Sequence, residues 1–269
     1  MTGSVIDRDA GSPARLRVLV AHNAYQLRGG EDSVVEAETA LLRQQGHEVD
    51  LWIRHNNDVS GMSRLNVARQ TLWSTETVST LRDRVARFQP DVILLQRQVG
   101  AERLAAMQRM KAFSSAFKVY ELDDYLPNLP LKNAHRQHMP KDILKSLRRG
   151  LAYVDRFVVS TAPLAEAFAD LHADIRVIEN RLPVQWWGGL QSKRRVSARP
   201  RVGWAGGSSH TGDLEMIADV VSELAGEVDW VFFGMCPDKL RPYMKEVHAG
   251  VEINRYPQAL ASLNLDLAL

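Results

Sequence analysis

Short apolar runs alternate with longer amphipathic segments along most of the chain, and this alternation constrains the fold more than any other feature. Strands are expected at residues 17–21, 49–53, 91–95, 117–122, 156–160 and 175–178. Helices are expected between them at residues 31–45, 64–88, 102–113, 139–151 and 163–171. Strands and helices in this order predict an α/β fold built on a doubly wound parallel sheet.

The same pattern starts again after a change of composition. Residues 184–199 are rich in Gly, Ser, Lys and Arg, which is typical of a linker. Beyond them we expect strands at 200–205, 228–233 and 251–254, and helices at 214–224 and 239–247. The predicted organisation is therefore a disordered leader (1–15), an N-terminal domain (16–183), the linker and a C-terminal domain (200–269). The apolar segment 263–269 predicts that the second sheet continues beyond Leu269, so this domain is expected to be incomplete.

Composition narrows the class of protein. The 269 residues include 45% hydrophobic residues, which is enough for a sizeable core, and the formal net charge is only +2. We therefore expect no nucleic-acid partner. The single cysteine, Cys236, excludes a disulfide framework and favours a cytoplasmic location. No apolar stretch reaches membrane-spanning length, and the polar leader lacks the apolar core of a signal peptide.

A glycine turn follows the first expected strand. It contains Gly29 and Gly30 and is followed at once by the acids Glu31 and Asp32. Structurally, the acids would stabilise the start of the next helix. Functionally, glycines allow a ligand to approach the backbone, and carboxylates accept hydrogen bonds from sugar hydroxyls more readily than they tolerate a bare phosphate. Both interpretations are compatible with these residues.

A second glycine turn follows the first strand of the C-terminal domain. It reads Gly206, Gly207, Ser208, Ser209 and His210. Its main-chain N–H groups and hydroxyls could bind a diphosphate, and the histidine could neutralise charge on a leaving group. The alternative is a plain turn before a helix capped by an acid. Because the pattern is not GxGxxG with a downstream acid, a dehydrogenase is rejected.

An acidic pair, Asp123–Asp124, follows the fourth expected strand. It has three interpretations: a Mg²⁺ site, a solvated loop, or contact with an acceptor substrate. We favour acceptor contact through Asp124. The chain order argues against a phosphoacceptor receiver domain, which would carry its acids after the first strand.

Two other features each have two interpretations. The segment Lys141–Arg149 combines an apolar stripe with a basic face, which fits an ordinary surface helix or peripheral contact with an anionic membrane. The pair Trp186–Trp187 in the linker fits packing at a hinge or stacking on a sugar or base.

Together these motifs carry a resemblance to a known family. The order of strand, GGED, helix and GHEV resembles the N-terminal domain of family-4-type glycosyltransferases of the GT-B fold. The segment RVIENRLP (176–183) resembles the entry into the second domain of that family. The segment RPRVGWAGGSSHTGDL (199–214) resembles the opening of its donor-binding domain, in a form found among cell-surface polysaccharide enzymes.

The resemblance implies two Rossmann-like domains and the transfer of a sugar from a nucleotide-diphosphate donor to a hydroxyl acceptor. It also implies retention of anomeric configuration, no metal, and no cofactor besides the nucleotide-sugar substrate. Gly29, Gly30, Glu31 and Asp123 would bind the acceptor, a glycan or lipid-linked sugar, and Asp124 would be catalytic. The second glycine turn would bind the donor phosphates. The enzyme would act in the cytoplasm or peripherally at the inner membrane face.

The sequence departs from the family pattern in three places. Asp123–Asp124 stands where the family often has His-Asp, and the Arg and Lys that hold the donor diphosphate are not evident. The E-x7-E segment that binds the donor sugar is absent from the 269 residues. These departures support an alternative: a non-catalytic sugar- or nucleotide-binding module, or a degenerate partner subunit of a glycosyltransferase.

Overall fold

The computed structural model describes residues 14–24, 30–55, 67–97, 99–128, 139–191, 199–207 and 210–269. The predicted leader lies almost wholly outside these residues. The chain divides into two compact units. The first contains the described residues up to Leu122 with Arg148–Val158 and Phe168–Arg176, and the second contains the rest.

The first sheet has six strands in the order β2-β1-β3-β4-β5-β6. β1 pairs in parallel with β2 and β3, and β3 pairs in parallel with β4. The strands span β1 (Arg17–Ala24), β2 (Glu48–His55), β3 (Val92–Gln96), β4 (Phe117–Leu122), β5 (Arg156–Val159) and β6 (Ile175–Val177). The chain thus reverses its direction of travel across the sheet between β1 and β3, and this is the topological switch point.

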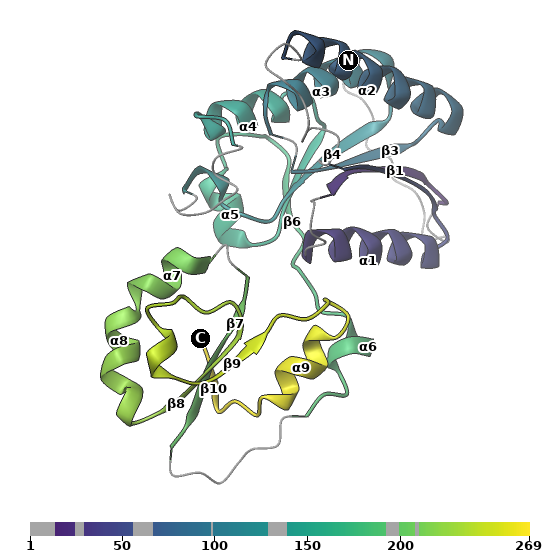
Figure 1. Cartoon of the computed structure of the whole chain (residues 1–269). Coiled ribbons are helices and arrows are strands. Elements are labelled where there is room, and N and C mark those ends of the chain that lie inside the picture. The colour runs from purple at the N-terminus through teal and green to yellow at the C-terminus, as the bar shows by residue number, and fades with distance from the viewer. Residues whose placement is uncertain are drawn as a thin grey trace. The chain divides into compact units, whose positions relative to one another are not determined.

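Helices cover both faces of the first sheet. Figure 1 shows α1 (Gly30–Gln44) on one face and α2 (Val67–Phe88) with α3 (Ala101–Phe113) on the other. Alternation along β1 explains this, because Val18 and Val20 pack with Val35 of α1 while Leu19 points to the opposite face. Both faces are therefore buried, as expected for a doubly wound sheet.

The second sheet has the order β10-β7-β8-β9, with parallel pairing throughout. Its strands are β7 (Arg201–Gly206), β8 (Asp229–Gly234), β9 (Met244–Ala249) and β10 (Leu267–Ala268). Trp230 and Phe232 pack with residues of α7 (Thr211–Met216) and α8 (Ala218–Glu223). Val231 and Phe233 pack with α9 (Tyr256–Ser262) on the other face. The prediction of an α/β fold with two parallel, doubly wound sheets is confirmed.

Three parts of the predicted secondary structure are wrong in the second unit. The expected helix 239–247 is a short 3₁₀ turn, η7 (Arg241–Tyr243), followed by strand β9. Residues 251–254 are not a strand, and α9 was not expected. Exposure alternates along MKEVHA of β9, which identifies a strand with one exposed face rather than a helix.

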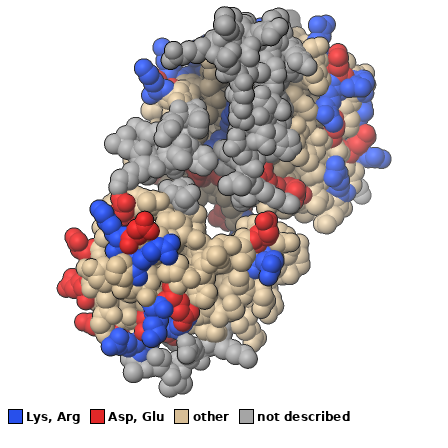
Figure 2. Space-filling model, viewed as in Figure 1, with Lys and Arg blue, Asp and Glu red and all other residues tan. Residues whose placement is uncertain are grey.

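The other elements are short. They are η3 (Leu126–Asn128), α4 (Ile143–Leu151), α5 (Ala162–Ala167), α6 (Val184–Trp187) and η6 (Leu224–Gly226). Helix α6 lies within the residues predicted to be a linker. None of the helices among the described residues is long and apolar enough to cross a membrane. On the face shown in Figure 2, basic and acidic side chains are interspersed rather than gathered by sign.

A repeated pair of hydrogen bonds fixes the beginnings of neighbouring strands. The main-chain N–H of Arg17 donates to Asp91 Oδ2 at 2.8 Å, and the N–H of Asp91 donates back to the Arg17 carbonyl at 2.8 Å. The same reciprocal contact, which we call a strand-start clasp, joins two further pairs across strands: Lys118 with Asp155, and Arg201 with Asp266. Each clasp fixes the register of two adjacent parallel strands at their amino ends.

Candidate functional site

A buried histidine lies at the carboxyl end of β1, beside the switch point. The side chain of His22 is only 5% exposed, and its Nε2 lies 2.8 Å from Oδ1 of Asp32 in the first turn of α1. The donor and acceptor roles of the two ring nitrogens depend on the tautomer: a proton on Nε2 would be donated to the carboxylate and would leave Nδ1 as the acceptor nitrogen. Parallel α/β sheets bind ligands beyond the carboxyl ends of strands at this point. The pair therefore lies where a substrate group is expected.

The neighbouring strand β3 ends in a second polar contact. Gln96 Nε2 donates to Glu38 Oε2 of α1 at 2.8 Å and to Glu121 Oε2 of β4 at 3.1 Å. Arg97, the next residue, has a φ of 47°, and its main-chain N–H donates to the carbonyl of Glu121. A positive φ in a residue other than glycine is uncommon and tends to cluster at functional sites. The carboxyl ends of β1, β3 and β4 thus present polar groups held in fixed positions.

The predicted acceptor-side residues fall in two places. Gly29 lies outside the described residues, while Gly30 and Glu31 are the first two residues of α1. Asp123 and Asp124 follow β4 in an exposed loop. The Asp123 carbonyl accepts a hydrogen bond from Ser160 Oγ at 3.2 Å, and the Asp124 carbonyl accepts one from the N–H of Leu126. Their roles in binding or catalysis remain predictions.

Glycines stand at the carboxyl ends of β7 and β8. Gly234 has a φ of +100°, and a Cβ there would overlap the carbonyl oxygen of Gly206. The N–H of Met235 donates to the same carbonyl at 3.2 Å. Gly207 differs, because no described residue other than its chain neighbours has an atom within 4 Å of the place that its Cβ would occupy. Gly234 thus allows the ends of β7 and β8 to approach closely, and Gly206 leaves room for the ring of Trp204, whereas Gly207 leaves open backbone.

His210 is the N-cap residue immediately before α7, close in sequence to this open backbone. Its N–H donates to the Gly207 carbonyl at 3.2 Å, and its Nδ1 lies 3.0 Å from Oδ2 of Asp213. Its ring meets Trp204 edge-on, with 6.2 Å between the ring centroids. The Asp213 contact leaves Nε2 as the nitrogen for a ligand. Ser208 and Ser209, predicted beside it, lie outside the described residues.

The two tryptophans of the predicted linker differ. The ring of Trp187 packs edge-on against Tyr256 of α9 at 6.3 Å between centroids, and Tyr256 stacks on Phe233 at 5.3 Å. Trp187 is therefore part of the packing of the second unit, which favours the hinge interpretation for this residue. Trp186 is 37% exposed.

Sequence reasoning missed His22, Gln96 and the structural role of Gly234. One signal was available: the apolar run VLVA ends in a histidine, ten residues before an aspartate in the first turn of a helix. Such a buried histidine needs a partner, and the following element begins with two acids, Glu31 and Asp32. Gln96 gave no comparable signal, because its partners lie 25 and 58 residues away.

Solved structures with the same fold are all distant in sequence. The galactosyltransferase WaaB of the lipopolysaccharide outer core matches with a TM-score of 0.63 and 13% identity, over 93% of this chain and 72% of that chain. The catalytic domain of starch synthase IV from Arabidopsis thaliana, bound to ADP and acarbose, gives 0.60 and 11%, over 95% and 78%. HepE from Anabaena, in complex with UDP and glucose, gives 0.58 and 14%, over 94% and 73%.

These matches establish the fold, which is that of GT-B glycosyltransferases. Nucleotide-sugar epimerases also occur among the similar structures, so the fold by itself does not define the reaction. No protein-family model matches the chain. No curated protein sequence matches it either.

Proposed function

We propose that this chain is a glycosyltransferase that moves a sugar from a nucleotide-diphosphate donor to a hydroxyl acceptor. The observation that carries the proposal is the combination of this fold with polar or open backbone groups at the carboxyl ends of both sheets. Two of the three similar structures named above hold a nucleoside diphosphate, ADP or UDP. In the reaction, the bond from the anomeric carbon to the diphosphate breaks, and a bond to the acceptor oxygen forms.

In the first unit, the His22–Asp32 pair would position the acceptor. In the tautomer that carries its proton on Nε2, His22 would donate to Asp32, and Nδ1 would accept the hydrogen bond of a substrate hydroxyl. A hydroxyl held in this way attacks from a fixed direction, and such fixed positioning is a main source of enzymatic rate enhancement. Gly29, Gly30 and Glu31 would contact the rest of the acceptor. Asp123 and Asp124 belong to the second unit, where Asp123 is a further proposed acceptor contact and Asp124 is the proposed catalytic carboxylate.

In the second unit, the turn after β7 would hold the donor phosphates. Gly207 leaves room for phosphate oxygens to reach main-chain N–H groups. His210 would donate from Nε2 when protonated and so stabilise the charge of the departing diphosphate. Gly206, Ser208 and Ser209 complete the proposed donor turn.

Finer features are proposed on the resemblance alone: retention of configuration, independence of metal, and a role in cell-surface polysaccharide or glycan synthesis. A cytoplasmic location is supported by the single, reduced cysteine. For peripheral membrane contact, the support is the basic face of α4, although Leu147 and Leu151 of its apolar stripe are buried.

The decisive experiment combines binding and turnover. The purified chain is titrated with UDP, ADP and GDP by calorimetry, and then incubated with the matching nucleotide sugars while products are followed by NMR. Binding with release of nucleoside diphosphate, accelerated by an acceptor, supports the transferase. Binding without turnover supports the binding module or partner subunit. Altered sugar configuration without release identifies an epimerase, and no nucleotide binding contradicts the proposal.

A further inference from the structure

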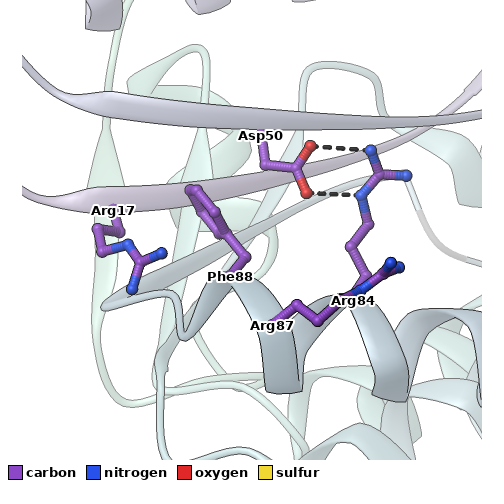
Figure 3. Close-up of a pocket in the computed structure, with 5 residues that line it drawn as sticks. All are labelled: Arg17, Asp50, Arg84, Arg87 and Phe88. Atoms are coloured by element: carbon purple, nitrogen blue, oxygen red, sulfur yellow. Dashed lines mark hydrogen bonds and ion pairs between the residues drawn. The ribbon is translucent and has the colours of Figure 1, made fainter.

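A pocket of about 420 Å³ lies at the amino edge of the first sheet, opposite to the edge that carries His22 and Gln96. It is formed by the beginnings of β1 and β2 and by the end of α2 (Figure 3). The residues that line it are Arg17, Asp50, Arg84, Arg87 and Phe88. None of them belongs to the candidate functional site, so any ligand here would be a separate one.

Two of the three arginines are held in place before any ligand arrives. Arg84 donates to both carboxylate oxygens of Asp50, from Nε at 2.5 Å and from Nη2 at 2.9 Å. Figure 3 shows this pair as two parallel dashed lines. The guanidinium carbon of Arg17 lies 4.7 Å from the ring centroid of Phe88, and its main chain is fixed by the strand-start clasp. Guanidinium groups ordered in advance lose little entropy when they bind an anion.

Positive charge exceeds negative charge in the lining, because three guanidinium groups face one carboxylate. Glu48 approaches Arg17 Nε only to 3.6 Å, and it also lies 3.9 Å from Arg15. Arg17 Nε is buried and has no hydrogen-bond partner within the part of the chain that the structure describes. Arg87 donates to the main-chain carbonyl of Asp83 at 3.3 Å, and no described carboxylate lies within ion-pair distance of it. Arg17 is thus within ion-pair distance of Glu48 and Arg84 is paired with Asp50, which leaves Arg87 as the guanidinium of the lining without a described carboxylate partner.

The carbonyls at the end of α2 account for part of this arrangement, since cations favour the C-terminus of a helix. They explain Arg87 in the last turn, but they do not explain Arg17, which comes from β1. We propose that this pocket binds a phosphate group, carried either by a soluble phosphorylated compound or by a lipid headgroup. A phosphate offers several oxygens to the planar N–H donors of arginine, and both Arg17 and Arg87 have donors for it.

The test measures binding of inorganic phosphate to the full chain by calorimetry at constant ionic strength, with chloride as the reference anion. We expect saturable binding that weakens at least tenfold in R87Q and disappears in R87E. The Arg87 side chain is exposed, so both variants should fold. The matched control is R82Q, an exposed arginine of the same helix outside the pocket, which should bind like the native chain. Equal phosphate binding in all four proteins, or none in the native chain, overturns the proposal.

A vesicle arm distinguishes the two sources of phosphate. The same proteins are sedimented with phosphatidylcholine vesicles, with and without phosphatidic acid. Sedimentation that needs phosphatidic acid, is lost in R87E and is competed by phosphate identifies a lipid headgroup. Phosphate binding without sedimentation identifies a soluble compound. UDP affinity should be unchanged in R87Q. Absence of phosphate binding at this pocket would therefore not contradict the proposed function, and absence of nucleotide binding would not contradict the phosphate site.

Discussion

His22 Nε2 and Asp32 Oδ1 lie 2.8 Å apart, and this contact joins the end of a buried strand to the start of the helix that follows it. The two residues are ten positions apart in sequence, and the pair lies at the switch point of the sheet. We expect H22Q and D32N each to lower the transfer rate by about 10²-fold, the usual scale for loss of a positioned acid-base or hydrogen-bonding group. UDP affinity should stay within about twofold, because the proposed donor site lies in the other unit.

The double variant H22Q/D32N provides the control for this prediction. If the two side chains act as a unit, it should be scarcely slower than either single variant. Losses that multiply would mean that the residues act separately. Full transfer activity in H22Q, with an unchanged thermal unfolding temperature, would remove the pair from the site.

Two glycines of the second sheet should respond oppositely to alanine. G234A places a Cβ against the Gly206 carbonyl at a positive φ, so we expect it to lower the free energy of unfolding by about 1–3 kcal/mol. G207A adds a methyl group in open space and should leave stability unchanged while weakening UDP binding several-fold. Denaturant unfolding and calorimetry measure the two effects. G226A, also in open space, is the control, and equal UDP affinity in G207A and G226A would contradict the proposed donor turn.

Stability at acid pH should depend on Glu246. Hydrogen bonds from Arg201 and then His248 lower its pKa from 4.5 to about 2. An acid whose pKa is lower in the folded state stabilises the fold fully above the unfolded pKa, and this contribution is lost as the pH falls from about 4.5 to 2. E246Q should therefore flatten the fall in unfolding free energy across that range. At pH 7 it should destabilise the chain by about 1–3 kcal/mol, since Arg201 is buried and loses its charged partner.

Glu252 provides the comparison for this pH profile, because it is exposed and lies in a turn near the end of β9. E252Q should follow the native curve at every pH. If the unfolding free energy of E246Q fell as steeply as that of the native chain between about pH 4.5 and 2, the ion pair with Arg201 would not contribute to stability.

Cys236 should react slowly with thiol reagents in the folded chain. Burial raises the pKa of its thiol, and the side chain is only 7% exposed, so little thiolate is present at neutral pH and access is poor. We expect the rate of reaction with a chromogenic disulfide to rise by at least tenfold when the chain is unfolded in guanidinium chloride. Rapid reaction in the native state would mean that the end of β8 opens readily.

The first sheet could be predicted almost completely from the sequence, because each strand is an apolar run and each helix begins after a clear turn. The expected strand 117–122 coincides with β4, and the expected helix 102–113 differs from α3 by one residue. Prediction failed at residues 239–247, where a charged, alternating segment contains apolar residues at spacings that also fit a helix. Only its pairing with β8 makes this segment a strand, and pairing is a tertiary effect that local pattern does not contain.

The candidate site was predictable only in part. Glycine turns after strands are visible in the sequence, which is why Gly30 and Gly206 could be placed at strand ends. Side-chain contacts across elements are not visible, so the link from Gln96 to Glu38 and Glu121 went unseen. The distinction between Gly207 and Gly234 also needs three dimensions, since it depends on which backbone lies opposite each glycine.

The three strand-start clasps fix the register of the strands at the amino edges of the sheets, whereas the polar groups of the candidate site lie at the carboxyl edges. Register is set at the amino edge, by contacts such as that of Arg17 with Asp91, which join residues 74 positions apart. The register of the strands therefore does not depend on the loops at the carboxyl edge. Such loops can be lengthened, exchanged or recombined without a change in the register of the strands. This architecture gives a protein engineer a place to graft new loops onto an unchanged scaffold.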